Sequence, residues 1–238
     1  MIIVGNLKMN QTLEEASIYE SKLTNSGIII CPSFPYLPIY KQNGYELCAQ
    51  NVSEYNDGPY TGDVSASQLK SLKVKYVLIG HSERRHVYKE AQESLNNKVL
   101  KSLKQGMQVV YCIGETYEQK QNNQTFQTIE NQILSLFNII DNNDINKIII
   151  GYEPVWAISD GINPGATPTN QEIDEVNKYI TELVKEKYNQ NIKILYGGSV
   201  NLNNIEQLVK LNNNAGFLIG GASKNVEDLL KIQEICKQ

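Results

Sequence analysis

The sequence predicts an α/β fold, a single closed (β/α)8 barrel, on two observations. Eight short apolar runs rich in Ile and Val recur along the chain, and several are too continuous for strands with one face in water. Longer segments with helical apolar spacing separate them, which is typical of parallel βαβ units, and eight such units in 238 residues fit a closed barrel. The expected strands cover residues 2–4, 28–31, 45–49, 76–79, 108–112, 148–152, 192–195 and 216–219.

The clearest helical patterns lie at residues 91–103, 129–140, 173–184 and 226–236. A doubly wound open sheet is the alternative fold, but it usually has fewer strands at this length and often a glycine-rich fingerprint after the first strand. Residues 5–10, Gly-Asn-Leu-Lys-Met-Asn, lack that spacing. No composition shift or linker marks a boundary, so we expect one domain over residues 1–238.

The composition argues against several classes of protein. The chain is 41% apolar and 20% charged with a net charge of −4, which argues against non-specific nucleic-acid binding. The longest apolar stretches span about five or six residues, too few to cross a membrane. Residues 1–5 lack the charged region and apolar core of a signal peptide, so we expect a cytoplasmic protein that binds neither nucleic acid nor membrane.

The cysteine and histidine content predicts no metal site, and no cofactor is expected. No CxxC pair or Cys/His cluster is present, and His81 and His86 are the two histidines of the sequence. The cysteines are expected to be reduced thiols of a cytosolic protein, most of them buried in or near strands. They are Cys31, Cys48, Cys112 and Cys236.

A carboxylate stands at the carboxyl end of the sixth expected strand, the end that lines the catalytic face of such a barrel. Glu153 directly precedes Pro154, which forces the chain out of the sheet, and a segment rich in Gly and Pro follows at 159–165. A carboxylate fixed beside a movable loop suits a gated general base. An ordinary solvated or capping glutamate is the alternative for Glu153 taken alone.

A lysine and a histidine follow two other strands. Lys8 stands two residues after Asn6, so both side chains can point the same way, and the lysine would offer a fixed positive charge to an anionic substrate. His81 precedes a predicted helix, whose positive end disfavours imidazolium, so a neutral imidazole would donate to a developing oxyanion. A solvated lysine and a structural histidine are the alternatives. Glu83 either pairs with Lys8 or is an ordinary first-turn glutamate.

Glycine pairs follow the last two strands, at Gly197–Gly198 and Gly220–Gly221. Such pairs are often only tight turns, but here backbone N–H groups and helix N-termini would form a phosphate cradle, and these two loops are the usual phosphate site of the architecture. One carboxylate base, one neutral electrophile and a phosphate cradle favour proton abstraction next to a carbonyl. The predicted reaction is therefore aldose–ketose isomerisation of a small phosphorylated sugar through an enediolate.

Two further segments are noteworthy. Residues 50–63 form a polar, turn-rich connection longer than the usual two to six residues, so we expect a functional or contact-making loop, with a decorative surface excursion as the alternative. Arg84 and Arg85 could bind phosphate, but a structural ion-pair role is preferred because a helix continues from there.

Seven motifs in order make the chain similar to the triosephosphate isomerase family over its whole length. They include Gly-His-Ser-Glu-Arg-Arg at 80–85 and Tyr-Glu-Pro-Val-Trp-Ala-Ile at 152–158. The resemblance implies a single-domain TIM barrel that interconverts dihydroxyacetone phosphate and D-glyceraldehyde 3-phosphate in glycolysis and gluconeogenesis, without a cofactor. The motifs cover residues 5–10, 49–51, 80–85, 112–115, 152–158, 196–200 and 216–223.

The resemblance also implies the roles of the catalytic residues, which are known for this family. Glu153 would move the proton between the two substrate carbons, and His81 would act on the carbonyl oxygens. Lys8, with Asn6 beside it, would stabilise charge, and Glu83 would support Lys8.

The resemblance further implies a set of phosphate and lid contacts. The phosphate would be held by Ser199, Gly220, Gly221 and the backbone at Ser159. Ile158 and Leu218 would clamp over Glu153 and keep the base dry. Lid closure would bring Ser199 towards Gly161, and Tyr196 towards Ala166.

The family is dimeric, so the resemblance implies a homodimer in which the loop around Thr61 inserts into the partner near the active site. The chain departs from the family's usual pattern in its lid, which is two residues longer and has Ser159 in place of a glycine, followed by Asp160. Leu7 replaces a common tryptophan.

Two other functions remain open at this point. A non-catalytic sugar-phosphate-binding or surface-interaction protein that keeps the barrel would suit the altered lid. A different phosphate-handling barrel enzyme is the other alternative. The complete set of catalytic residues favours an active isomerase over both.

Overall fold

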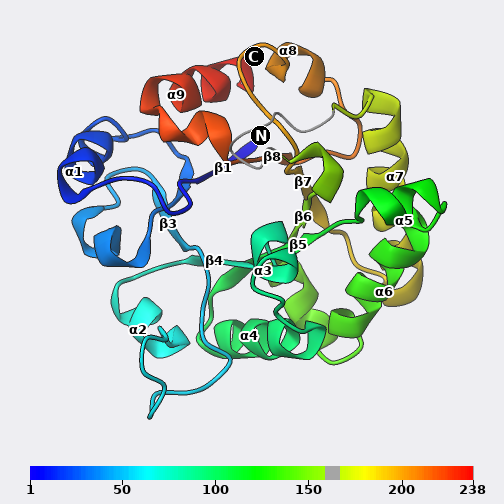
Figure 1. Cartoon of the computed structure of the whole chain (residues 1–238), viewed down its shortest axis with the longest axis horizontal. Helices are drawn as coiled ribbons and strands as arrows, with labels where there is room; N and C mark the ends of the chain where they lie inside the picture. Colours follow the sequence, from blue (N-terminus) through cyan, green and yellow to red (C-terminus); the bar gives the residue numbers. More distant parts are fainter. Residues whose placement is uncertain (159–166, 238) are drawn as a thin grey trace.

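The structure, a computed structural model, describes residues 1–158 and 167–237, in which eight parallel strands close into a barrel in chain order. Each strand pairs with its neighbours in sequence, and the last pairs with the first. Figure 1 shows the strands at the centre of a ring of helices. The predicted fold class is confirmed, and every strand lies within two residues of its predicted bounds. The strands are β1 (Ile2–Asn6), β2 (Ile29–Cys31), β3 (Glu46–Ala49), β4 (Tyr76–Ile79), β5 (Gln108–Ile113), β6 (Ile148–Tyr152), β7 (Lys193–Tyr196) and β8 (Gly216–Ile219).

The helices pack around the barrel, and several begin with a capping box in which Thr or Ser and a Glu or Gln three residues later satisfy each other's backbone N–H groups. The α-helices are α1 (Leu13–Ser21), α2 (Ala66–Ser71), α3 (Ser82–His86), α4 (Gln92–Lys104), α5 (Tyr117–Gln121), α6 (Thr125–Phe137), α7 (Asn170–Tyr188), α8 (Ile205–Leu208) and α9 (Val226–Ile235). The 3-10 helices are η1 (Phe34–Ile39), η2 (Asn142–Lys147), η3 (Val155–Ala157) and η4 (Gly221–Lys224).

The connection between β2 and β3 is a 3-10 helix, η1, rather than an α-helix. Pro35 and Pro38 lack the N–H group that an α-helix interior would need. The α6 helix begins four residues before its predicted start and ends three before its predicted end, since the apolar pattern continues into a turn. These differences leave the order of the barrel unchanged.

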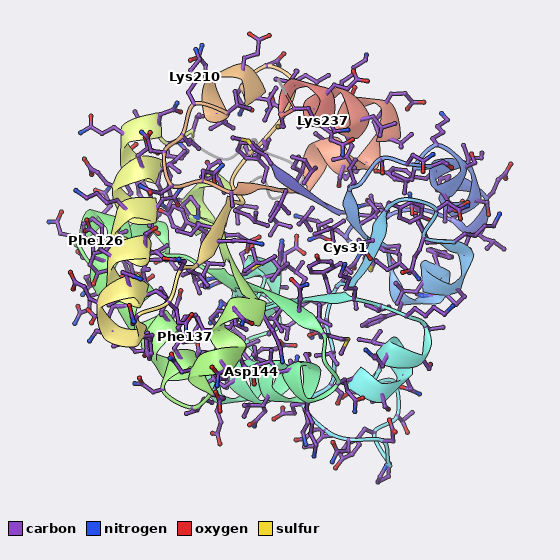
Figure 2. All side chains as sticks on the ribbon, turned by 180° about the vertical axis from the view of Figure 1, so that it is seen from behind. Cys31, Phe126, Phe137, Asp144, Lys210 and Lys237 are labelled. Atoms are coloured by element: carbon purple, nitrogen blue, oxygen red, sulfur yellow. The ribbon has the colours of Figure 1, made fainter. Side chains whose placement is uncertain are left out.

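The apolar core has two layers. The larger lies between the strands and the helices, and the smaller is formed by alternate residues of all eight strands, which point into the barrel. Cys31, Cys48 and Cys112 belong to the inner layer, where they are buried and free, as predicted. In Figure 2, Cys31 lies among the interior side chains, whereas Phe126 and Lys210 lie at the periphery. Among the described residues, no helix is long and apolar enough to span a membrane.

A buried ionic cluster joins α3 and α4 to the loop after β3. Glu90 accepts hydrogen bonds from Arg84 and, at 2.6 Å, from the Lys98 ammonium, which also donates to Asn51 at 3.1 Å. The predicted ion-pair role is therefore correct for Arg84. It is wrong for Arg85, whose guanidinium donates to the backbone carbonyls of Gly80 and Cys112 at the ends of β4 and β5.

The cluster sets the ionisation of Glu90. Burial by itself would raise the pKa of this carboxyl, but the hydrogen bonds from Arg84 and Lys98 outweigh burial and hold the pKa below its usual value of 4.5. A carboxyl whose folded pKa is depressed contributes stability above its unfolded pKa. That contribution is lost as the pH falls through the lower folded pKa.

We therefore expect Glu90→Gln to lower the free energy of unfolding by about 3 kcal/mol at pH 7, because the buried Lys98 and the partly buried Arg84 lose their anionic partner. The difference from the wild type should shrink as the pH falls below 4.5, where the wild-type carboxyl also becomes neutral. Urea denaturation across this pH range measures the effect. The control is Glu182→Gln, which removes an exposed partner 3.8 Å from Lys178 and should change stability little. A pH-independent difference for Glu90→Gln would contradict the assignment.

Candidate active site

A cavity of about 460 Å³ opens at the carboxyl ends of the strands. It brings together nine of the residues predicted from the sequence, which come from both ends of the chain and from its middle. Its lining includes Asn6, Lys8, His81, Glu153, Ile158, Ser199, Leu218, Gly220 and Gly221. A second groove of about 500 Å³ lies between α1 and α9, where Glu15 caps its own helix and Glu227 pairs with Lys22.

Glu153 directly follows β6, and its side chain is 3% exposed. Its Oε2 accepts a hydrogen bond from the Ser82 backbone N–H at 2.9 Å, and its Oε1 lies 3.2 Å from His81 Nε2. Gly197 provides the space for this side chain, because a Cβ there would come within 2.8 Å of Glu153 Cγ. The carboxylate is thus buried, placed by two strand ends, and adjacent to the imidazole.

His81 is the N-cap residue of α3, and its Nδ1 accepts the backbone N–H of Glu83 at 3.3 Å. A ring nitrogen that accepts a hydrogen bond carries no proton, so this hydrogen bond assigns a neutral imidazole with its hydrogen on Nε2. The Glu83 carboxylate lies 3.6 Å from Nδ1, beyond hydrogen-bond distance, and is bound to Lys8 instead. The Nε2–H group therefore faces Glu153 as a neutral donor.

Lys8 has a left-handed backbone, with a φ of 52°. This conformation costs a non-glycine residue about 1–2 kcal/mol, so other contacts must hold it. The Lys8 carbonyl accepts from Ser33 Oγ and from Gln50 Nε2, both at 2.8 Å, and the Lys8 N–H donates to Asn6 Oδ1 at 3.1 Å. Ser33 and Gln50 were missed as site residues. The motif at 49–51 was a signal for Gln50, whereas the sequence gives no signal for Ser33.

The Lys8 side chain crosses the mouth of the barrel. Its Nζ lies 2.7 Å from Glu83 Oε1, so of the two alternatives for Glu83 the structure has the ion pair. Burial by itself would raise the pKa of Glu83, but the hydrogen bond from Lys8 and the nearby charges together outweigh burial and lower the pKa. A Cβ on Gly220 would lie 3.1 Å from Lys8 Cε, so the lysine stem passes directly over this glycine.

The two glycine turns border the cavity on the side of β7 and β8. Gly221 begins η4, and a Cβ there would meet no described atom within 4 Å, so this turn is open to a ligand. Ser199 donates both its N–H and its Oγ to the Ala157 carbonyl, at 3.1 and 3.0 Å. A Cβ on Gly198 would lie 2.1 Å from the Tyr196 hydroxyl, which therefore folds back over its own turn.

The remaining predicted lid and loop residues do not appear in the cavity lining, for two different reasons. Ser159, Gly161 and Ala166 fall outside the described residues, and so do the contacts predicted for them. Thr61 is exposed in the loop at 50–63, which projects beyond the ring of helices near α2 (Figure 1). A stacked pair, Tyr55 and Tyr60, orders this loop, with ring centroids 4.2 Å apart.

The segment after Glu153 is anchored to α5 and α7. The Trp156 indole donates to Glu115 Oε1 at 2.8 Å, and the Lys120 ammonium lies 3.5 Å from the centre of the Trp156 ring. Lys120 also pairs with Glu172 in the first turn of α7, at 2.7 Å. Burial raises the pKa of Glu115, although the hydrogen bonds from Trp156 and Tyr152 act to lower it. These contacts fix the chain on both sides of residues 159–166.

The described residues offer no cluster of three or more His, Cys, Asp or Glu side chains that would hold a metal ion. Cys112 lies close to Glu153, but burial first, and then the charge of Glu153, raise the pKa of its thiol well above the usual value. A thiol that stays protonated is a poor nucleophile. The groups placed for chemistry at neutral pH are therefore Glu153, His81 and Lys8.

Comparison with known proteins gives one consistent result. The profile of the family described as triosephosphate isomerase matches residues 1–236. The chain belongs to the triosephosphate isomerase family. It is 36% identical to the triosephosphate isomerase of Alkaliphilus oremlandii, over 97% of each chain. It is 38% identical to that of Chlorobaculum tepidum, over 98% of this chain and 99% of the relative, and 36% identical to that of Mesomycoplasma hyorhinis, over 99% and 98%.

Because the chain belongs to the triosephosphate isomerase family, isomerase turnover can be used to test the contacts that hold the Lys8 backbone. We expect Gln50→Ala to lower kcat/KM about tenfold, because the left-handed backbone of Lys8 loses one of the donors to its carbonyl. Asn96→Ala is the matched control, since it removes a side-chain amide that donates to the Ser135 carbonyl at 3.0 Å, between α4 and α6. Equal kcat/KM values in Gln50→Ala and Asn96→Ala would show that Gln50 does not support Lys8.

Proposed function

We propose that the chain interconverts dihydroxyacetone phosphate and D-glyceraldehyde 3-phosphate by proton transfer through an enediolate. The observation that supports this best is the 3.2 Å contact between a buried carboxylate, Glu153, and a neutral imidazole, His81, at one wall of the cavity. Lys8 and the turn at Gly220–Gly221 border the same cavity. The triosephosphate isomerase family and the names of the relatives support the same reaction.

The reaction needs one base and one hydrogen-bond donor. Glu153 would take a proton from the carbon next to the substrate carbonyl, and the electron pair of that C–H bond would form the carbon–carbon double bond of the enediolate. His81 Nε2–H would donate to the oxygen on which the negative charge develops, and the Lys8 ammonium would stabilise that charge. A proton moves from the hydroxyl oxygen on the first carbon to the oxygen on the second, with the His81 imidazole as its carrier. The proton on Glu153 then returns to the second carbon while the first carbon becomes the carbonyl, so atoms and charge balance and no cofactor is consumed.

The base needs to change partner during this cycle. In the structure Glu153 accepts from the Ser82 N–H and faces His81, so a substrate must enter between the carboxylate and the imidazole. A buried carboxylate with few solvent contacts then acts on the substrate carbon without competing water. The Ser82 N–H gives Glu153 a defined resting position between turnovers.

The phosphate of the substrate would occupy the opposite side of the cavity. Gly221 offers an open backbone turn at the start of η4, and Ser199 borders the same space. Backbone N–H groups at such a turn favour a dianion. A non-catalytic sugar-phosphate-binding protein is not favoured, because the catalytic carboxylate, imidazole and ammonium all border the cavity.

We expect Glu153→Gln to lower kcat about 10³-fold or more, because an amide cannot accept the proton. Glu153→Asp should cost about 10²-fold, because removing one methylene displaces the carboxylate by about 1 Å. A coupled enzyme assay measures both, and circular dichroism checks that each variant is folded. Turnover at the wild-type rate in both variants would remove Glu153 as the base.

We also propose that the protein is a homodimer and, as a glycolytic enzyme, cytoplasmic. Large side chains are exposed on the loop at 50–63 itself, with Tyr55 45% and Tyr60 41% exposed. The loop itself is held against α4, since Ser94 and Asn97 donate to Glu54 at 2.6 and 3.2 Å. An ordered, projecting loop with exposed aromatic side chains supports a contact with a second copy of the chain.

We expect light scattering at micromolar concentration to give the mass of two chains. Thr61→Arg should shift the mass towards one chain, because it places a charge at the tip of the loop. Thr24→Arg is the control, since it makes the same change at an exposed site after α1. A fully active wild-type protein with the mass of one chain would refute the dimer.

A further inference from the structure

Ser223 is fully buried and joins the ends of the first and last strands. Its Oγ lies 2.9 Å from the Asn6 carbonyl and 2.6 Å from the Gly220 carbonyl. A hydroxyl has one hydrogen, so Ser223 shares it between the two carbonyls. The serine stands in η4, behind the turn that borders the cavity.

The position of this link matters because the strand pairing stops just before it. The register of β1 and β8 ends with Gly5 opposite Ile219. Asn6 and Gly220 are the next residues on each strand, and the Ser223 hydroxyl bridges their carbonyls. Two residues after Asn6 comes Lys8, and one residue after Gly220 comes the open turn at Gly221. The hydroxyl therefore links the two short segments that carry the lysine and the turn.

A second residue supports Ser223 from outside the barrel. The Tyr19 hydroxyl, in α1, donates to the Ser223 carbonyl at 2.6 Å, and the Tyr19 side chain is buried. Ser223 is thus held at both its hydroxyl and its carbonyl. Neither residue lines the catalytic cavity, so both act through the groups that they hold.

We propose that Ser223, supported by Tyr19, is a positioning residue that fixes the distance between the Lys8 ammonium and the phosphate turn at Gly220–Gly221. This inference rests on the proposed function, in which the phosphate and the developing oxyanion of one substrate bind at these two places. If the inference is correct, removing the Ser223 hydroxyl weakens a ligand that contacts both places more than it weakens a ligand that contacts only the turn. Removing a serine with a purely structural role would affect both kinds of ligand equally.

The test compares two probes in Ser223→Ala. For 2-phosphoglycolate, which has a phosphate and a carboxylate at its two ends, we expect the Kd to rise about tenfold, the effect of one well-placed hydrogen bond. For inorganic phosphate, which contacts only the turn, the rise should be less than about twofold. Titration calorimetry measures both constants. The KM for dihydroxyacetone phosphate should rise with the Kd for 2-phosphoglycolate.

Ser102→Ala is the matched control, because Ser102 is equally buried and its Oγ donates to the Lys98 carbonyl within α4 at 2.9 Å. It should lower thermal stability without changing either Kd. Tyr19→Phe is the second variant. It removes only the donor to the Ser223 carbonyl and should raise the Kd for 2-phosphoglycolate about threefold, a smaller hydrogen-bond effect.

The outcomes are distinguishable. Equal losses for both probes in Ser223→Ala, or no loss with only a lower melting temperature, would overturn the spacing role. If Ser223→Ala does not fold, Tyr19→Phe decides the question by the same comparison. Absence of turnover in the wild type would refute the proposed function, while the two binding constants would still test Ser223.

Discussion

The mouth of the barrel is organised around one lysine held in a left-handed backbone conformation. Lys8 follows β1, but its carbonyl is held by Ser33 after β2 and by Gln50 after β3. Its ammonium pairs with Glu83 in α3, and its stem passes over Gly220 after β8. Without these contacts the conformation, at a cost of about 1–2 kcal/mol, would relax. Closure of the barrel brings these five strand ends within reach of one residue.

The charged side chains at the site differ in their exposure to water. The Lys8 and Glu83 side chains are 21% and 46% exposed, so their ion pair is partly screened and an incoming anion meets a reachable ammonium. Glu153 is buried on the other side of the cavity, where it accepts a hydrogen bond from the Ser82 N–H and lies 3.2 Å from the His81 imidazole. The carboxylate proposed as the base is thus not the partner of Lys8, which pairs with Glu83.

Much of this arrangement could be predicted from the sequence. The strands were predictable because parallel strands buried on both faces are continuous apolar runs, and closure followed from their number. Glu153, His81 and the glycine turns were predictable because catalytic residues of this architecture stand just after strands. The resemblance to the triosephosphate isomerase family added roles for these residues.

What could not be predicted depends on contacts between distant segments. Ser33 lies in ordinary sequence surroundings, and Ser223 is the last residue of a family motif that gives it no role. The links that both serines make are visible only once the strands that they join are adjacent. The left-handed conformation of Lys8 has no local cause such as glycine. Arg85 was expected in an ion pair, but its guanidinium donates to the carbonyls of Gly80 and Cys112, which lie near each other only because β4 and β5 pair.

The central claim is that one buried carboxylate moves a proton between adjacent carbons, and turnover in D₂O tests it most directly. If Glu153 takes the proton, that proton exchanges with solvent deuterium in a fraction of the turnovers before it is returned to carbon. The product should then contain deuterium at the single carbon that receives the proton, as measured by mass spectrometry and proton NMR. Product formed at the full rate with no deuterium would indicate direct hydride transfer between the carbons, and would contradict the account.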